Sequence, residues 1–224
     1  MALIEQKRLE HGVELGIWEI AETESYFLSQ LRLHEEEKLE LANIKGRRRV
    51  EWLASRYLVH LMLVDVGEVE LAARIPVLKD EFGKPHLHGS GYYLSFSHSH
   101  SRVAVILAPV LTGIDIQAFV RKIHVIEHRL LSRQEAATLK DSTRLEHLHL
   151  YWGAKESLYK AYGRRDIDFR KNLLVGPFDF KPESGAMSGR ITKDDFSRNF
   201  ELHYEMDGEY FLVWCLEIKP AVEL

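Results

Sequence analysis

Glu156 and Lys160 lie one helical turn apart in the stretch YWGAKESLYKAYG, residues 151–163. Apolar and aromatic residues recur around them at three- and four-residue steps, which predicts an amphipathic helix. A carboxylate and an ammonium at positions i and i+4 face the same way, where together they could hold a divalent cation and neutralise a phosphate. The same spacing is common in solvated ion pairs on helix surfaces, so the pair alone does not establish a site.

Asp115 is the second acidic side chain that requires an explanation. It lies in the segment TGIDIQ, residues 112–117, which has the composition of a strand. Alternation along that strand places Asp115 and Gln117 on one face, opposite the neighbouring isoleucines. Because aspartate is unfavourable in strands, we expect Asp115 to have a partner, either a hydrogen-bond donor or a metal ion.

The composition is that of an ordinary globular protein, with 46% hydrophobic and 29% charged residues among 224. The net charge of −4 argues against bulk nucleic-acid binding, which normally requires a basic surface. Cys215 is the only cysteine, so no internal disulfide can form. No apolar run approaches the ~20 residues that span a bilayer, and the first residues lack the apolar core of a signal peptide. We therefore expect a cytoplasmic protein with no membrane partner.

The order of the predicted elements indicates an α+β fold of two pseudo-duplicated halves, residues 1–111 and 112–224. Each half is expected to pack helices on a small, mostly antiparallel sheet. Ser132 and Glu135 resemble a capping box at a helix start. The predicted elements are a strand at 14–20, helices within 22–31, 34–42 and 45–63, strands at 92–98, 102–108 and 112–117, one or two helices within 121–140, a helix from about 145 to 162, and strands at 173–180, 188–192, 200–204 and 210–217.

Four short motifs occur in order along the chain. No GxxxxGK[ST] loop is present and no GxGxxG follows a predicted strand, which excludes the common nucleotide-binding folds. The motifs are GKP at 83–85, SFSHS at 95–99, GIDI at 113–116 and WxxKESxxKA at 152–161. In order and spacing they resemble the phosphopantetheinyl transferase superfamily, specifically its long, pseudo-duplicated (surfactin-synthetase-activating) class.

This resemblance implies transfer of the 4′-phosphopantetheine arm of coenzyme A to a serine of an acyl, aryl or peptidyl carrier protein, with Mg²⁺ bound between the enzyme and the pyrophosphate. Asp115 and Glu156 match the metal-binding carboxylates of the family. Glu156 also matches the candidate acceptor of the serine proton, and Lys160 matches the lysine that stabilises the leaving phosphate. Two acids from separate elements suffice for magnesium, because the ion retains waters and phosphate oxygens.

The resemblance also implies coenzyme A contacts, which are assigned to Arg49, Arg56, Lys84, Ser97, His98, Lys155 and Lys160. Arg49 and Arg56 lie about two helical turns apart and should project from one side of their helix, although arginines at such positions also commonly decorate a helix surface. We expect a monomer that binds coenzyme A and magnesium between its halves. The residues do not specify whether the carrier serves fatty-acid, polyketide or nonribosomal peptide biosynthesis.

Two positions depart from the family pattern. Many relatives have a glutamate as a third metal ligand where this chain has Gln117, and a neutral amide there would weaken the site or ligate through water. Relatives commonly have a glycine where this chain has His100. A bulky ring at that position could reshape the coenzyme A pocket.

Two other functions stay open. The HxH pairs at His86 and His88 and at His98 and His100 could bind zinc or iron if they lie on strands. A non-catalytic homologue that binds a carrier without modifying it is the third possibility, to which Gln117 lends weight. The transferase needs magnesium and coenzyme A, whereas a histidine site would copurify with a transition metal.

Overall fold

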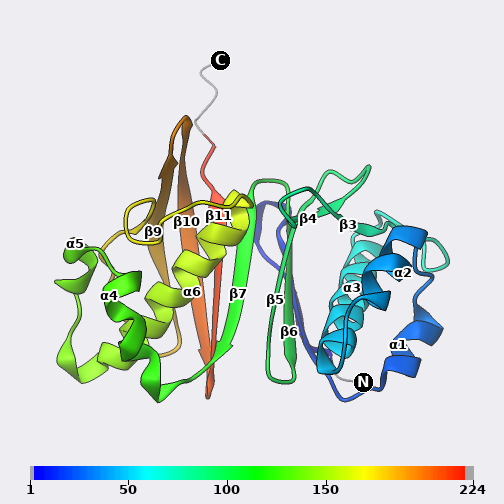
Figure 1. Cartoon of the computed structure of the whole chain (residues 1–224), viewed down its shortest axis with the longest axis horizontal. Coiled ribbons are helices and arrows are strands. Elements are labelled where there is room, and N and C mark those ends of the chain that lie inside the picture. The colour runs from blue at the N-terminus through cyan, green and yellow to red at the C-terminus, as the bar shows by residue number, and fades with distance from the viewer. Residues whose placement is uncertain (1–2, 220–224) are drawn as a thin grey trace. The chain divides into compact units, whose positions relative to one another are not determined.

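Helices and antiparallel strands share the chain in similar proportion, which confirms the predicted α+β class (Figure 1). The computed structural model describes residues 3–219. The chain forms two units, the first ending at Pro109 and the second beginning at Val110. Within the described residues, no helix combines the length and the apolar character needed to cross a membrane.

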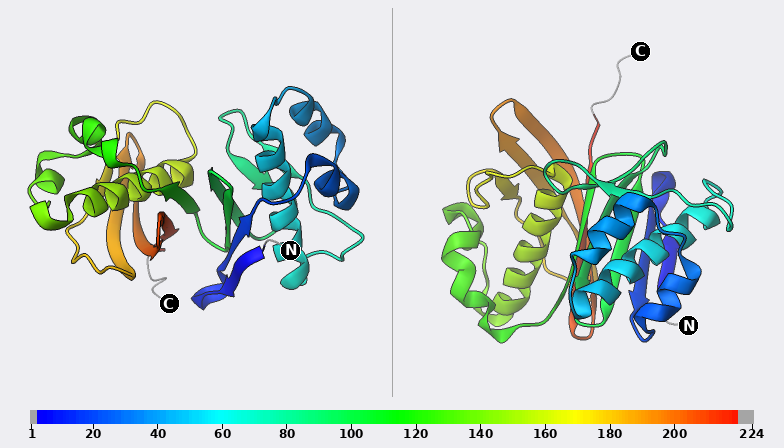
Figure 2. Two further views of the ribbon diagram at one scale, coloured as in Figure 1. Left: turned by 90° about the horizontal axis from the view of Figure 1, so that it is seen from below. Right: turned by 45° about the vertical axis from the view of Figure 1, so that its right-hand side comes forward.

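The first unit is built on a four-stranded antiparallel sheet with strand order β1-β2-β6-β5. Its elements are β1 (Leu3–Arg8), η1 (Glu10–Gly12), β2 (Glu14–Glu19), α1 (Glu24–Gln30), α2 (Glu35–Ala42), α3 (Arg47–Asp65), β3 (Val77–Lys79), β4 (Pro85–Leu87), β5 (Tyr93–Ser99) and β6 (Arg102–Ala108). Figure 2 shows the three helices of this unit on one face of its sheet. Strand β1 was not predicted, because its charged sequence LIEQKR lacks a strand pattern.

Helix α3 packs directly on the sheet of the first unit. Its inward face carries fully buried residues, among them Leu58 and Met62. A Cβ atom added at Gly16 of β2 would lie 2.9 Å from the Met62 sulfur, so the glycine is needed for this close packing. The burial of these side chains supplies the main stabilisation of the unit.

The second unit is built on a five-stranded antiparallel sheet with strand order β7-β11-β10-β9-β8. Its elements are β7 (Thr112–Ala118), η2 (Arg121–Ile126), α4 (Glu127–Leu130), α5 (Arg133–Ala136), η3 (Asp141–Thr143), α6 (Arg144–Tyr162), β8 (Leu173–Val175), β9 (Ser184–Lys193), β10 (Phe196–Asp207) and β11 (Tyr210–Glu217). Helix α6 crosses this sheet, as both Figure 1 and Figure 2 show. Cys215 is buried in β11, as expected for a small apolar side chain.

Small residues allow α6 to approach the sheet very closely. A Cβ atom added at Gly113 of β7 would lie only 1.9 Å from the Ser157 carbonyl oxygen. The backbones of β7 and α6 are therefore in direct contact at this position. The Ser157 hydroxyl donates to the Val213 carbonyl of β11 at 2.8 Å. An added Cβ atom at Gly153 would meet Val213 at 2.6 Å. This contact fixes the height and register of α6 over β7.

Two predictions about the second unit have different outcomes. The capping box is confirmed, because the Ser132 hydroxyl accepts from the Glu135 amide at 3.3 Å and the Glu135 carboxylate accepts from the Ser132 amide at 2.7 Å. The predicted strand at 173–180 is too long. Strand β8 ends at Val175, because Gly176 and Pro177 follow and proline has no amide hydrogen for a strand ladder.

Candidate active site

Asp115, Glu156 and Lys160 come together where β7 meets α6. The Lys160 ammonium donates to Asp115 Oδ1 at 2.8 Å and to the Ile114 carbonyl at 2.9 Å. Asp115 is 7% exposed and Lys160 is partly exposed. The expected donor partner of the strand aspartate is therefore a lysine 45 positions along the chain.

Glu156 lies within electrostatic reach of both residues. The pKa of Glu156 is raised to about 7, mainly by burial and secondly by the charge of Asp115, while the charge of Lys160 opposes the change. A carboxyl group with a pKa near neutrality can exchange a proton at physiological pH.

The donor set fits a magnesium ion. Asp115 and Glu156 supply carboxylate oxygens from two different elements, and the charge of Asp115 adds to burial in raising the pKa of Glu156. When bound, the ion would neutralise pyrophosphate charge and orient its oxygens. Among residues 3–219, no group of three or more His, Cys, Asp or Glu side chains is arranged to hold a metal.

A cavity of about 590 Å³ opens beside Glu156. Both apolar and polar residues line it: Ile126, His128, Arg129, Leu130, Trp152, Glu156, Asp168, Phe169 and Arg170. Trp152 and Glu156 lie one turn apart on α6, so an aromatic surface and a titratable carboxyl group face the same space. The volume is within the range that suits small-molecule and cofactor ligands.

Lys155 holds two walls of this cavity together. Its ammonium donates to the Leu130 carbonyl at 2.8 Å, to Glu135 Oε2 at 2.7 Å and to the Phe169 carbonyl at 2.8 Å. The side chain is 0% exposed, and all three ammonium hydrogens have protein acceptors. Lys155 therefore differs from the expected coenzyme A contact, because no donor is left for a phosphate.

The family comparison agrees with the geometry of the second unit. Residues 112–215 match the model of the 4′-phosphopantetheinyl transferase superfamily. This part of the chain is similar to the phosphopantetheinyl transferase superfamily. The match covers β7, α6 and all three residues of the cluster. No curated protein gives a significant match to the chain.

Gln117 of β7 has a structural contact. Its Nε2 donates to the His149 carbonyl of α6 at 2.8 Å. The buried His149 ring in turn accepts a hydrogen bond from the Val120 amide at Nε2, at 2.8 Å, and contacts the Leu145 carbonyl through Nδ1, also at 2.8 Å. The amide of Gln117 thus fastens the end of β7 to α6, where relatives place a third carboxylate.

Arg49 and Arg56 lie on one side of α3, as expected, and both reach toward α2. Arg49 donates to the Leu41 carbonyl at 2.6 Å and to Glu24 at 2.6 Å. Arg56 is 1% exposed, its guanidinium lies 3.6 Å from the Trp52 ring centroid, and Nη2 donates to Glu40 at 3.3 Å. Their observed contacts are internal to the first unit, which differs from the expected contacts to nucleotide phosphates.

The other predicted coenzyme A contacts lie near one another in sequence and on neighbouring elements. Lys84 precedes β4 and lines a cavity of about 240 Å³ together with His86 and residues 90–94. Ser97 is buried in β5, whereas the next residue, His98, is exposed and lies 3.4 Å from Glu51. A coenzyme A contact at Lys84, Ser97 or His98 stays a prediction.

The histidine pairs lie on exposed positions with separate partners. His86 Nε2 lies 3.0 Å from Asp80 Oδ2, which is the ordinary contact of a histidine at a turn. His100 has a φ of 52° in the turn between β5 and β6. This is the left-handed region, which glycine adopts without strain, and glycine is the residue that the resemblance led us to expect here. The backbone of His100 thus has a conformation that is uncommon for a residue with a side chain.

Sequence reasoning did not identify most of the cavity lining. Ile126, Arg129 and Leu130 have helical spacing that could have indicated one shared face. Phe169 and Arg170 lie between the predicted helix that ends at 162 and the predicted strand that begins at 173, in a segment without a predicted helix or strand. No local pattern connects that loop to α6, because the connection depends on the Lys155 contact to the Phe169 carbonyl.

Proposed function

We propose that this protein transfers the phosphopantetheine arm of coenzyme A to a serine of a carrier protein. The observation that carries the proposal is the meeting of Asp115, Glu156 and Lys160 beside the cavity that Glu156 lines. These residue types supply metal ligands, a proton acceptor and a cation, which phosphoryl transfer needs more than a covalent intermediate.

Each residue has a defined role in the proposed reaction. The serine oxygen forms a bond to the phosphorus next to the arm, and the phosphorus–oxygen bond to the nucleotide breaks, releasing adenosine 3′,5′-bisphosphate. Glu156 accepts the serine proton, for which a pKa near 7 is suited. Lys160 offers its charge to the phosphate oxygens. Asp115 keeps Lys160 in place and would share the magnesium ion with Glu156.

The cavity beside Glu156 suits the uncharged, flexible pantetheine arm. Trp152, Phe169 and Leu130 provide apolar surface, and the polar lining residues offer donors and acceptors to the amides of the arm. The opening lies on the same side of α6 as the proposed base. The arm could therefore extend from the reacting phosphate over a continuous protein surface.

A surface near the cavity suits the carrier. Val120 and Val125 are 51% and 59% exposed, and the exposed Arg121, Lys122 and Arg129 lie close to them in sequence. Exposed apolar and basic side chains in one segment attract a partner with apolar and acidic groups. Val125→Glu should raise the KM for the carrier about tenfold and leave the KM for coenzyme A unchanged, whereas Leu174→Glu on β8 serves as the matched exposed control.

The deciding experiment is incubation with coenzyme A, magnesium and a panel of unmodified carriers, read by mass spectrometry for the added arm. Asp115→Asn and Glu156→Gln should each lower the rate by about 10²–10⁴-fold while the circular dichroism spectrum stays unchanged. Glu201→Gln, on the exposed side of β10, is the control. Binding of a carrier without any added arm would instead support the non-catalytic homologue, and full activity of both variants would refute the proposed roles.

A further inference from the structure

A second cavity, of about 260 Å³, lies wholly within the first unit. It is bordered by the end of α1, the middle of α3 and the segment 71–74. Its polar lining residues are Ser29, Gln30, Arg32, Tyr57, His60 and Arg74. Among the described residues that line it, none is acidic. The cavity therefore presents arginine and neutral polar groups without a carboxylate of its own.

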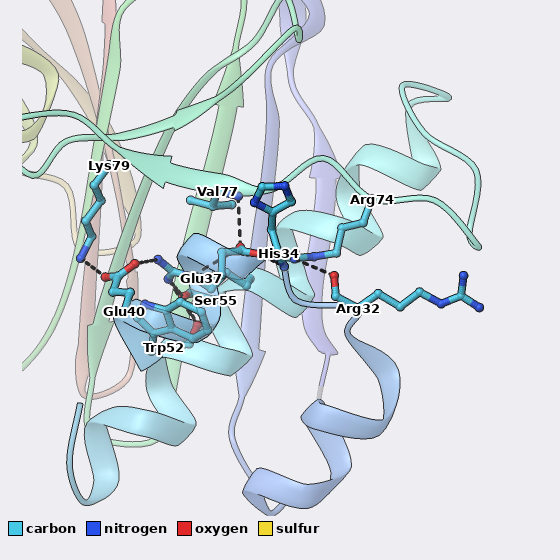
Figure 3. A network of polar contacts seen from close by, with 10 residues as sticks. Arg32, His34, Glu37, Glu40, Trp52, Ser55, Arg74, Val77 and Lys79 are labelled. Carbon is cyan, nitrogen blue, oxygen red and sulfur yellow. Dashed lines mark hydrogen bonds and ion pairs between the residues drawn. The ribbon is translucent and has the colours of Figure 1, made fainter. Parts of the chain in front are cut away.

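The ion-pair network behind this cavity has an excess of positive charge. Glu37 is fully buried and accepts from both terminal nitrogens of Arg74, at 2.6 Å for Nη2 (Figure 3). The same carboxylate lies 4.0 Å from Arg56 Nε. Glu40 is shared between Arg56 and Lys79. Three cations thus share two carboxylates, and Arg74 lies at the cavity end of the network.

The positive charge extends to His60. The pKa of His60 is lowered by burial and then by the charge of Arg74, so Arg74 acts electrostatically on a second lining residue. His60 is 5% exposed, and within residues 3–219 neither its Nδ1 nor Arg74 Nε has a hydrogen-bond partner. Two of the residues that line the cavity thus each carry a buried nitrogen that makes no hydrogen bond within residues 3–219.

Arg32 supplies an accessible cation at the same cavity. Its guanidinium makes a single long contact, from Nη1 to the Ala72 carbonyl at 3.4 Å. Figure 3 shows the Arg32 side chain extended away from Glu37, while its backbone carbonyl accepts from Arg74 at 3.3 Å. A guanidinium in this position can rotate to present two donors to an oxyanion.

We propose that this cavity binds a small phosphate-bearing molecule, with Arg32 as the principal charged contact and Ser29 and Tyr57 as neutral polar contacts. A phosphate has more oxygens than a carboxylate to distribute among such donors. The volume lies slightly below the range of drug-sized ligands, which favours a phosphate monoester the size of glycerol 3-phosphate over a nucleotide. The site goes beyond the proposed transferase function, since it uses none of the residues of the Asp115 cluster.

The test measures the thermal stability of the full chain during titration with glycerol 3-phosphate, inorganic phosphate or acetate at constant ionic strength. Both phosphates should raise the melting temperature of the wild type, and acetate should not. Arg32→Ala should weaken phosphate binding about tenfold or more, because a charge-assisted contact is lost. Arg32→Lys should restore part of it. Arg48→Ala, an exposed arginine on α3, is the matched control.

Equal stabilisation of Arg32→Ala and the wild type would overturn the proposal, as would equal stabilisation by acetate or the same loss in Arg48→Ala. Absence of any phosphate effect at millimolar concentration would also overturn it. The two proposals fail separately, because this binding is measured without coenzyme A or carrier. Arg32→Ala should modify a carrier at the wild-type rate, and a defect in transfer would overturn the proposal that this site is separate from the transfer reaction.

Discussion

The Lys160 ammonium lies 2.8 Å from Asp115 Oδ1, which joins the end of α6 to the middle of β7. The contact neutralises a largely buried carboxylate that would otherwise be costly. Lys160 also donates to the backbone of the same strand, so its position does not depend on Asp115 alone. A lysine held in this way is pre-organised to meet a phosphate without a large rearrangement.

Lys160→Ala should slow the chemical step by about 10²–10³-fold, because the cation that stabilises the phosphate is removed. The KM for coenzyme A should change little, since the loss falls mainly on the transition state. Rapid-quench single-turnover measurements separate these effects. Lys140→Ala, at an exposed position, is the control. A large rise in KM with an unchanged chemical rate would assign Lys160 to ground-state binding instead.

Glu156→Gln should change how stability depends on pH in the absence of divalent cations. The folded-state pKa of Glu156 is raised to about 7, above the ordinary value of 4.5. Its contribution to stability is therefore fully present below pH 4.5 and is lost as the pH rises toward 7. The Glu156→Gln variant has no carboxyl group at this position, so its stability does not fall for this reason as the pH rises. Relative to the variant, the wild type should thus become less stable between about pH 4.5 and 8, as measured by urea unfolding.

Magnesium should oppose that loss. Since the ion binds the deprotonated carboxylates, its affinity should rise as the pH increases through about 7, and binding should release protons. Isothermal titration calorimetry in buffers of different ionisation enthalpy measures this release. Affinity that does not vary between pH 6 and 8 would contradict a shared site at Glu156.

Lys155→Met should destabilise the protein by about 3–5 kcal/mol, because it leaves the buried Glu135 carboxylate without its cation. In the double variant Lys155→Met/Glu135→Gln the loss should be smaller than the sum of the two single losses. Urea denaturation of all four proteins completes this cycle. A stable Lys155→Met protein with a raised KM for coenzyme A would restore the cofactor role expected from the sequence.

Gly113→Ala should damage stability and activity together. The new methyl group would lie 1.9 Å from the Ser157 carbonyl oxygen, so β7 and α6 must move apart. We expect a loss of about 1–3 kcal/mol from overpacking and a fall in kcat of about 10²-fold from displacement of the site. Gly91→Ala is the control for stability, since its added Cβ atom meets nothing within 4 Å among the described residues. Normal kcat in Gly113→Ala would show that the spacing of β7 and α6 is not critical.

Local sequence patterns were sufficient to predict the strand that carries Asp115 and the helix that carries Glu156 and Lys160. Helical spacing predicted the helix with Glu156 and Lys160 on one side, and strand alternation separated Asp115 from its isoleucine neighbours. The capping box at Ser132 was also predictable, because both of its hydrogen bonds join residues three positions apart. Strand β1 and the end of β8 were missed, since their conformations depend on pairing with a neighbour or on a single proline.

The sequence by itself determined which chemical groups are available: two acids and a lysine on a predictable strand and helix, in motifs that resemble a phosphopantetheinyl transferase. Only the tertiary structure decided which partners the lysine side chains bind. Lys155 and Lys160 are five positions apart on the same helix, yet one is buried among carbonyls and the other reaches a strand carboxylate. The physical reason is that the environment of a charged side chain is set by segments far away in the chain, and residue type and spacing do not specify which segments those will be.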